Sequence, residues 1–277
     1  MLDLIFQQNS LIVAAAIFIG MTVAVEFGFR AGKPVQVRES ETTRTHINAI
    51  QGSLLGFLAL ILGFTLSLSL QRYDNRSQAV VDEANAIGTT WLRAQLLPDS
   101  VRSQVQASLS EHVNLRVRAG SIDLAHESAR TALLVETNRN LDSIWKLALQ
   151  AAAETPEMVV SGLFIQALND MIDSYGRRDA ALARHVPNEI LLLLFATFVL
   201  TGGVVGYAAG VAGHRPSVTT YVLVMLIVVL SFVIMDLDRP RRGMIRIDQS
   251  SLVDLGSAIA TGRDPSQGTS RAVIGRP

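Results

Sequence analysis

The charged residues that could act on one another chemically lie at the end of a long apolar run, in the stretch DLDRPRR. Its two acids follow the expected C-terminal end of a helix, where the helix dipole is negative and a carboxylate needs a cationic partner. Arginines of the same stretch, and two that follow an earlier apolar run, supply such partners. We therefore predict a charge clasp formed by Asp236, Asp238, Arg239, Arg72 and Arg76. The alternative is a plain stop-transfer patch, which would explain the arginines and leave the acids unexplained.

Residue patterns for catalysis or metal binding are sparse. The absence of cysteine excludes disulfides, thiol catalysis and thiolate metal sites. The five histidines are scattered without ligand spacing, so neither a metal nor a cofactor is expected. No phosphate loop, dinucleotide fingerprint or nucleophile elbow occurs, and we expect no enzyme. A formal net charge of zero gives no indication of a nucleic-acid partner.

The elements that would position the clasp are membrane helices. Of 277 residues, 49% are hydrophobic and only 17% are charged, which is more apolar than a soluble domain usually is. Four windows free of charge each hold the roughly 20 apolar residues that a spanning helix needs. They predict spans near residues 6–28, 50–70, 190–210 and 217–235. The long middle segment shows helical periodicity and no convincing strand alternation. The predicted fold class is all-α, a polytopic membrane protein with four transmembrane helices and a helical cytoplasmic domain.

The spans divide the chain into four predicted parts. Residues 1–70 hold the first two transmembrane helices, 71–187 the cytoplasmic helical domain, 188–236 the last two transmembrane helices, and 237–277 a cytoplasmic C-terminal segment, disordered after about 262. Arginines close to the membrane are more numerous on the side of the large segment, and the positive-inside rule places that side in the cytoplasm. We expect a multi-pass protein of the cell inner membrane with both termini inside.

The second span carries the most informative pattern. No proline interrupts the chain before Pro98, so the helix is predicted to continue beyond the membrane. At helical spacing, small residues form a stripe: Gly52, Gly56, Ala59, Gly63 and Ser67. The same face continues through a candidate vestibule: Asp74, Ser77 and Asn85. One interpretation is tight packing against another helix, because small residues let backbones approach closely in lipid. The other is that the stripe, or the opposite face with Phe57 and Phe64, surrounds a pore on an oligomer axis.

Two further patterns concern packing. Arg72, Arg76 and Glu83 share a face away from the stripe, which suits either ion pairs with a neighbour or a solvated charged surface. The run GGVVGYAAG in the third span spaces glycines four residues apart, which is typical of close helix packing and not of a cofactor loop.

Several long motifs resemble the bestrophin-like domain family of bacterial integral membrane proteins. They are GFTLSLSLQRYDNRSQAVVDEANAIGTTWLRAQLLP, RHVPNEILLLLF, GYAAG and DLDRPRRGMIRIDQSSLVDL, and the resemblance covers about residues 50–255. A relation to bestrophins implies an ion channel with four membrane helices, cytoplasmic termini and a pore lined by the second membrane helix. It also implies a homo-oligomer, a pentamer by analogy, whose partners are the lipid bilayer and inorganic ions. Bestrophin gating and calcium-site residues have no match here, and the chain lacks a clear acidic calcium cluster.

Two functions remain open at this point. One is an oligomeric ion channel whose second transmembrane helix lines the pore. The other is a non-conducting, membrane-anchored helical module that acts as a scaffold or in signalling.

Overall fold

The computed structural model describes residues 10–35, 41–122, 127–154, 161–184, 186–239 and 244–263. Within these ranges the ordered elements are helices, and no strand occurs, which confirms the all-α class. The elements are α2 (Ser10–Gly32), η1 (Lys33–Val35), α3 (Glu41–Ala94), α4 (Asp99–Ser121), α5 (Glu127–Glu154), α6 (Leu163–Ala183), α7 (Asn188–Ala212), α8 (Val218–Leu237) and α9 (Ser250–Ala260). The disorder predicted after about 262 concerns residues 264–277, which lie outside the described part of the chain.

The chain divides into two compact units. Unit 1 comprises Met1–Tyr73 and His185–Ile245, and unit 2 comprises Asp74–Arg184 and Arg246–Pro277. Helix α3 contributes its first part to unit 1 and the remainder to unit 2.

Four helical segments are long and apolar enough to cross a membrane, as predicted: Ser10–Val35, Glu41–Ala94, Glu189–Ala212 and Val218–Leu237. Many of their large apolar side chains lie exposed on the single chain, among them Phe27, Leu200 and Leu226. A contiguous apolar surface of this kind marks a lipid or protein interface. A lipid environment accounts for it in a membrane protein.

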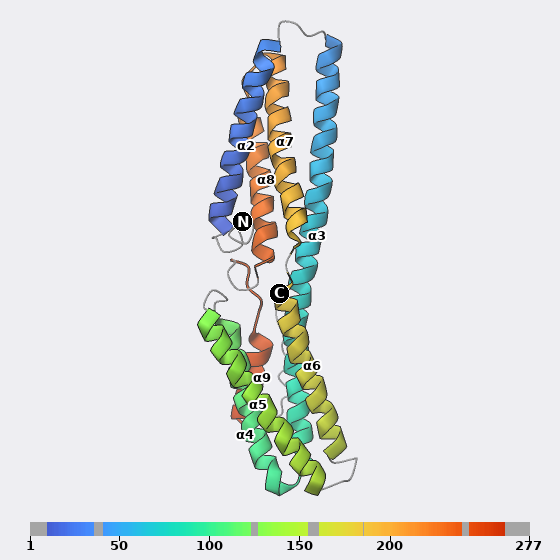
Figure 1. The fold of residues 1–277 in the computed structure, drawn as a ribbon, viewed down its shortest axis with the longest axis vertical. Helices are drawn as coiled ribbons and strands as arrows, with labels where there is room; N and C mark the ends of the chain where they lie inside the picture. Colours follow the sequence, from blue (N-terminus) through green and yellow to red (C-terminus); the bar gives the residue numbers. More distant parts are fainter. Residues whose placement is uncertain are drawn as a thin grey trace. The chain divides into compact units, whose positions relative to one another are not determined.

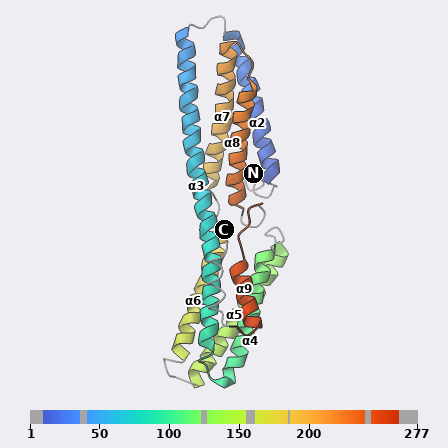
Figure 2. The ribbon, with the colours of Figure 1, turned by 180° about the vertical axis from the view of Figure 1, so that it is seen from behind.

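The closest backbone approach in unit 1 is between α2 and α7, which lie side by side in both views (Figures 1 and 2). A Cβ added at Gly206 or Gly210 would overlap the backbone of α2, at the carbonyl oxygens of Val25 and Phe29 respectively. Gly28 of α2 meets the backbone of α7 in the same way. The glycine run of α7 therefore packs as the sequence predicts, backbone against backbone.

The turn between α7 and α8 depends on a left-handed residue. Gly213 ends α7 with φ +82°, and its N–H donates to the carbonyl oxygens of Ala209 and Gly210. A side chain is strained at that φ, so glycine suits this position, and Pro216 shortly after it prevents the helix from continuing. The chain then continues within unit 1 as α8.

Helix α3 is a single helix of 54 residues, about 80 Å long at the standard rise. It begins at Glu41, nine residues before the span predicted from the sequence, and continues without a break to Ala94. Pro98 separates it from α4, as predicted, and occupies the N-cap position of that helix.

Unit 2 packs the second part of α3 with α4, α5, α6 and α9 (Figure 2). The inner face of α4 is buried and comprises Val101, Val105, Leu109 and Val113. The inner face of α5 is largely buried, with Leu133, Leu141, Ile144 and Ala148 in the core and Trp145 half-buried. Amphipathic helices thus supply the core of unit 2.

A candidate pore helix and a buried charge cluster

Within unit 1, α3 presents three faces. One face is buried against its own chain: Leu58, Leu62, Thr65 and Ser69. The predicted stripe forms a second face and is exposed throughout: Gly52, Gly56, Ala59, Gly63 and Ser67. A third, apolar face is also exposed: Phe57, Leu60, Phe64 and Leu68. Two of the three faces are therefore left uncovered by this chain.

The glycines of the stripe have no close neighbour in the chain. A Cβ added at Gly52, Gly56 or Gly63 would meet no other atom of the described structure within 4 Å. The stripe thus does not pack against another described helix of the same chain. Lipid, a second copy and a pore are all compatible with this exposure, so the role of the stripe stays a prediction.

The candidate vestibule residues lie further along α3, in unit 2. Asp74 and Asn85 are exposed and Ser77 is half-buried. They lie on a different side of the helix from Glu83, which is fully buried. Their vestibule role also stays a prediction.

The acids at the end of α8 are buried and bond to backbone groups of unit 1. The carboxylate of Asp238 accepts from the N–H of Val186 at 3.1 and 3.2 Å. Oδ2 of Asp236 accepts from the N–H of Ile245 at 2.8 Å. Both acids therefore hold neighbouring segments of the chain, at Val186 and Ile245, against the end of α8. The stop-transfer alternative does not explain these bonds.

The arginines of the predicted clasp have partners of several kinds. Nη1 of Arg239 donates to Oγ of Ser10 at 3.1 Å. In unit 2, Nε and Nη2 of Arg76 donate to the carbonyl oxygens of Ala181 and Arg184 at 3.1 and 2.5 Å, at the C-terminal end of α6. Nη1 of Arg72 is buried and has no hydrogen-bond partner among the described residues. Direct pairing of the acids with Arg72 or Arg76 stays a prediction.

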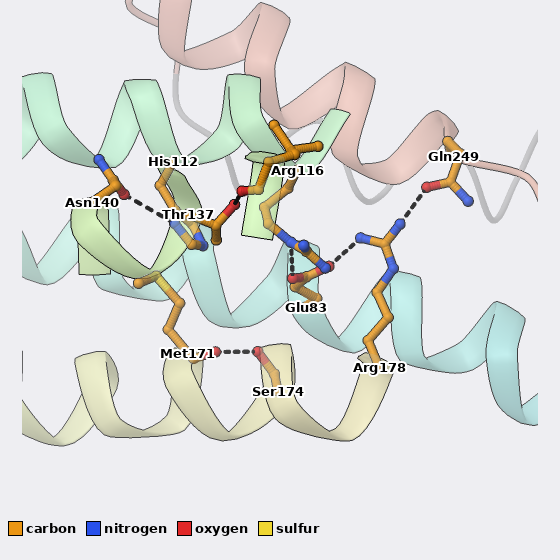
Figure 3. Close-up of polar contacts among 10 residues, drawn as sticks. Glu83, His112, Arg116, Thr137, Asn140, Met171, Ser174, Arg178 and Gln249 are labelled. Carbon is orange, nitrogen blue, oxygen red and sulfur yellow. Dashed lines mark hydrogen bonds and ion pairs between the residues drawn. The ribbon is translucent and has the colours of Figure 1, made fainter. Parts of the chain in front are cut away.

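A buried charge cluster in unit 2 joins residues from four segments (Figure 3). Glu83 of α3 has no exposed surface. Its Oε1 accepts from Nε of Arg116 of α4 at 2.6 Å, and its Oε2 accepts from Nη1 of Arg178 of α6. Nη2 of Arg178 donates to Oε1 of Gln249, just before α9, at 2.6 Å. Of the two sequence interpretations for Glu83, ion pairing is confirmed, and its partners belong to the same chain.

The cluster has more positive than negative charge. Two guanidinium groups and one carboxylate leave a net charge of +1 among these residues. The guanidinium of Arg116 also lies 4.5 Å from the ring centroid of Tyr175, a cation–π contact. Burial lowers the pKa of Arg178 from its ordinary value, and the charge of Glu83 opposes that shift. The carboxylate is thus the residue on which both buried cations depend.

His112 lies one turn before Arg116 on α4 and is fully buried. Its Nδ1 is 3.1 Å from Oδ1 of Asn140, whose Nδ2 donates to the carbonyl oxygen of Ser108. That second bond fixes the amide orientation, so Nδ1 of His112 carries the proton and donates. Nε2 is buried without a hydrogen-bond partner in the described structure. Burial, followed by the nearby charge of Arg116, lowers the pKa of His112 to about 4.

The cluster connects the helices of unit 2. Together with the His112–Asn140 contact it connects α3, α4, α5, α6 and the segment before α9. Among the described residues, no group of three or more histidine, aspartate or glutamate side chains is placed to hold a metal ion. Sequence inspection missed Arg116 and Arg178, although both lie in phase with buried apolar positions of their helices.

Comparisons with known proteins agree with this architecture. Two solved variants of a bacterial bestrophin homologue from Klebsiella pneumoniae align over 95% of this chain, with TM-scores of 0.60 and 0.59. The alignments cover 100% and 99% of those chains, at 16% and 17% identity, so the similarity concerns the fold. A search of functionally curated proteins finds no match. The model of the Bestrophin-like domain matches residues 14–252. With four helices suited to a membrane and this match over most of its length, the chain belongs to the bestrophin-like domain family.

Proposed function

We propose that this membrane protein is an oligomeric ion channel in which α3 lines the conduction pathway. The observation that carries the proposal is the exposure of α3. Only 22% of its most apolar window is buried, compared with 28%, 39% and 33% for the other three candidate spans. A membrane helix with two uncovered faces has one for a neighbouring copy and one for a pore.

A ring of copies would use both faces of α3. Closed rings of identical subunits place equivalent helices around one axis. The phenylalanine face, with Phe64 64% exposed, would supply an apolar constriction, and the small stripe would allow close approach of the next subunit. The same geometry also allows the reverse, in which the small stripe lines the pore and the phenylalanine face contacts the next subunit. Kinship with bestrophins favours a pentamer, with inorganic ions as the permeating species.

Flux through liposomes tests the proposal. Purified protein should form a ring-sized particle and release ions from loaded vesicles, and Phe64→Ala or Gly56→Leu should change the rate or the ion preference. Ile19→Ala, on the exposed apolar surface of α2, is the matched control and should leave flux unchanged. A monomeric or dimeric particle, or vesicles that stay tight over a range of ions and voltages, would favour the scaffold alternative.

We propose that the protein lies in the cell inner membrane, with unit 2 and both termini in the cytoplasm. Because the sequence contains no cysteine, single-cysteine variants can be made without first replacing native cysteines. Thr42→Cys, near the start of α3, should react with a membrane-impermeant thiol reagent in intact cells. Ser103→Cys, exposed on α4, should react only after lysis. Labelling of position 103 in intact cells would reverse the orientation.

A further inference from the structure

The end of the described chain packs on unit 2 as a short amphipathic helix. Helix α9 has 11 residues and buries one face: Leu252, Leu255, Ala258 and Ile259. It lies along α4, where Gly256 brings its backbone close to Cγ1 of Val113. An isolated helix of this length is not stable in water. Its structure therefore depends on remaining docked.

A polar contact joins this helix to the charge cluster. Oε1 of Gln249, the residue before α9, accepts from Nη2 of Arg178 at 2.6 Å. The side chain of Asp248 accepts from both the N–H and the hydroxyl of Ser250 and so orders the start of the helix. The apolar face of α9 and the Gln249 amide, placed against a buried guanidinium, thus both contribute to holding the segment from Arg246 to Ala260.

The last turn of α4 leaves room for the Gln249 side chain. A Cβ added at Gly120 would lie 2.7 Å from Oε1 of Gln249 and 3.1 Å from its Cδ. An alanine at position 120 would therefore displace the amide from this slot. The contact has a shaped site and is not an incidental surface bond.

The chemistry of the contact limits its strength. Arg178 is only 2% exposed, and it shares the carboxylate of Glu83 with Arg116. The remaining acceptor is a neutral amide, where a carboxylate would form a stronger, charge-assisted bond and balance the surplus positive charge. At the point where α9 joins the other helices of unit 2, the chain thus has the amide of glutamine, which is a weaker acceptor than the similarly sized carboxylate of glutamate.

We propose that residues 246–260 form a detachable strap, whose release point is the contact between Arg178 and Gln249. Docking of the strap completes the hydrogen bonding of a buried cation, and release leaves that cation without one acceptor. Because the bonds of Glu83 with Arg116 and Arg178 join α3, α4 and α6 without the strap, the strap opens while these helices stay folded, and its opening is adjusted by the charge at position 249. The inference concerns unit 2 alone and does not depend on ion conduction.

Hydrogen–deuterium exchange of the full-length protein in detergent tests the strap. In the parent protein the backbone amides of α9 should exchange faster than the buried amides of α4 and α6, because they open locally. Gln249→Ala should accelerate exchange in α9 by about tenfold to hundredfold, since it removes a hydrogen bond to a charged group. Gly120→Ala should act in the same direction by blocking the slot. Gln249→Glu should slow exchange in α9 by about tenfold or more.

Matched controls separate the contact from general effects. Val253→Glu adds the same charge on the exposed side of α9, and Ser257→Ala removes a hydroxyl there, so both should leave exchange near the parent value. Exchange of α9 in step with α4 and α6 in the parent would overturn the strap, because α9 would then open only with the whole unit. Exchange in Gln249→Glu as fast as in the parent would overturn position 249 as its release point.

Discussion

The two units hold their helices together in different ways. In unit 1, α2 and α7 meet through glycines, backbone against backbone, and buried acids bond to peptide N–H groups. In unit 2, amphipathic helices enclose an apolar core in which one carboxylate is shared by two arginines. The difference follows from the solvent. Lipid provides no hydrophobic force between helices, so close packing must hold them, whereas water drives apolar burial and tolerates buried charge only when it is paired.

The largest effect is expected at the glycine contact of unit 1. Gly206→Leu would place a side chain where the backbone of α2 lies, so the helices must separate along their length. We expect a loss of about 5 kcal/mol or more in the free energy of unfolding, or failure to fold. Hydrogen exchange should show lost protection in α2 and α7 and retained protection in α4 and α6. Equal loss in both units would mean that they are not held independently.

Removing the shared carboxylate should give the next largest effect, in unit 2. Glu83→Gln keeps the shape but leaves the guanidinium groups of Arg116 and Arg178 without a counter-charge. We expect unfolding to become easier by about 4 kcal/mol. Glu136→Gln, whose carboxylate forms a 3.7 Å surface pair with Arg118, is the control and should change stability by less than about 1 kcal/mol. A similar result for both variants would contradict the role of Glu83.

Acid should weaken unit 2 through His112. In the folded protein the pKa of His112 is about 4, below the ordinary 6.5. As pH falls below 6.5, His112 therefore becomes protonated in the unfolded chain and stays neutral in the folded chain. The free energy of unfolding should decrease by about 2 kcal/mol between about pH 7.5 and about pH 5. Measuring unfolding across this range with His112→Gln as reference isolates the contribution. An unchanged pH profile in that variant would assign the sensitivity to other groups.

A smaller effect is expected at the end of α8. Asp238→Asn removes a charged acceptor from the N–H of Val186 and should cost about 1.5 kcal/mol. The predicted clasp adds a second expectation. Combined with Arg72→Gln, the variant should lose less than the sum of the two single losses. Strictly additive losses would leave Asp238 as a backbone anchor and remove Arg72 from the clasp.

The smallest effect on the chain itself is expected at the open stripe. Gly56→Ala adds a methyl group where no atom of the described residues lies within 4 Å, so the fold should gain about 0.5 kcal/mol from better helix propensity. The same substitution at Gly206 should be strongly destabilising, which makes the pair a direct comparison of two helices. Particle mass, measured alongside stability, reports whether the stripe of α3 contacts another copy. A clear loss of stability without any change in mass would contradict the open environment of Gly56.

The membrane helices were predictable because lipid imposes a long window free of charge, and the uninterrupted course of α3 followed from the absence of proline before Pro98. The packing role of the glycines in α7 was also predictable. Their counterparts in α3 have the same type and similar spacing but meet no other described part of the chain, and spacing alone does not distinguish these environments. That distinction requires knowing which helices are neighbours.

The charge cluster could not be assembled from the sequence for a related reason. Glu83, Arg116 and Arg178 come from three helices separated by 33 and 62 positions, and pairing them requires the packing of the whole unit. One local signal was present. Arg116 follows Val113 by three residues and Arg178 follows Met171 by seven, so each arginine falls on the buried face of its helix. A cation in phase with core residues needs an internal anion, and Glu83 was already recognised as a candidate for ion pairing.

The uninterrupted hydrogen-bond ladder of α3 also has a mechanical consequence. Gly52 and Phe64 lie 12 positions apart in the part of α3 that belongs to unit 1, a rise of about 18 Å along the helix axis. Neither proline nor a break lies between them, so this stretch has no hinge at which twist could be absorbed. A rotation of Gly52 about the helix axis must therefore turn Phe64 through nearly the same angle. Within unit 1, α3 is therefore able to transmit torque along its length.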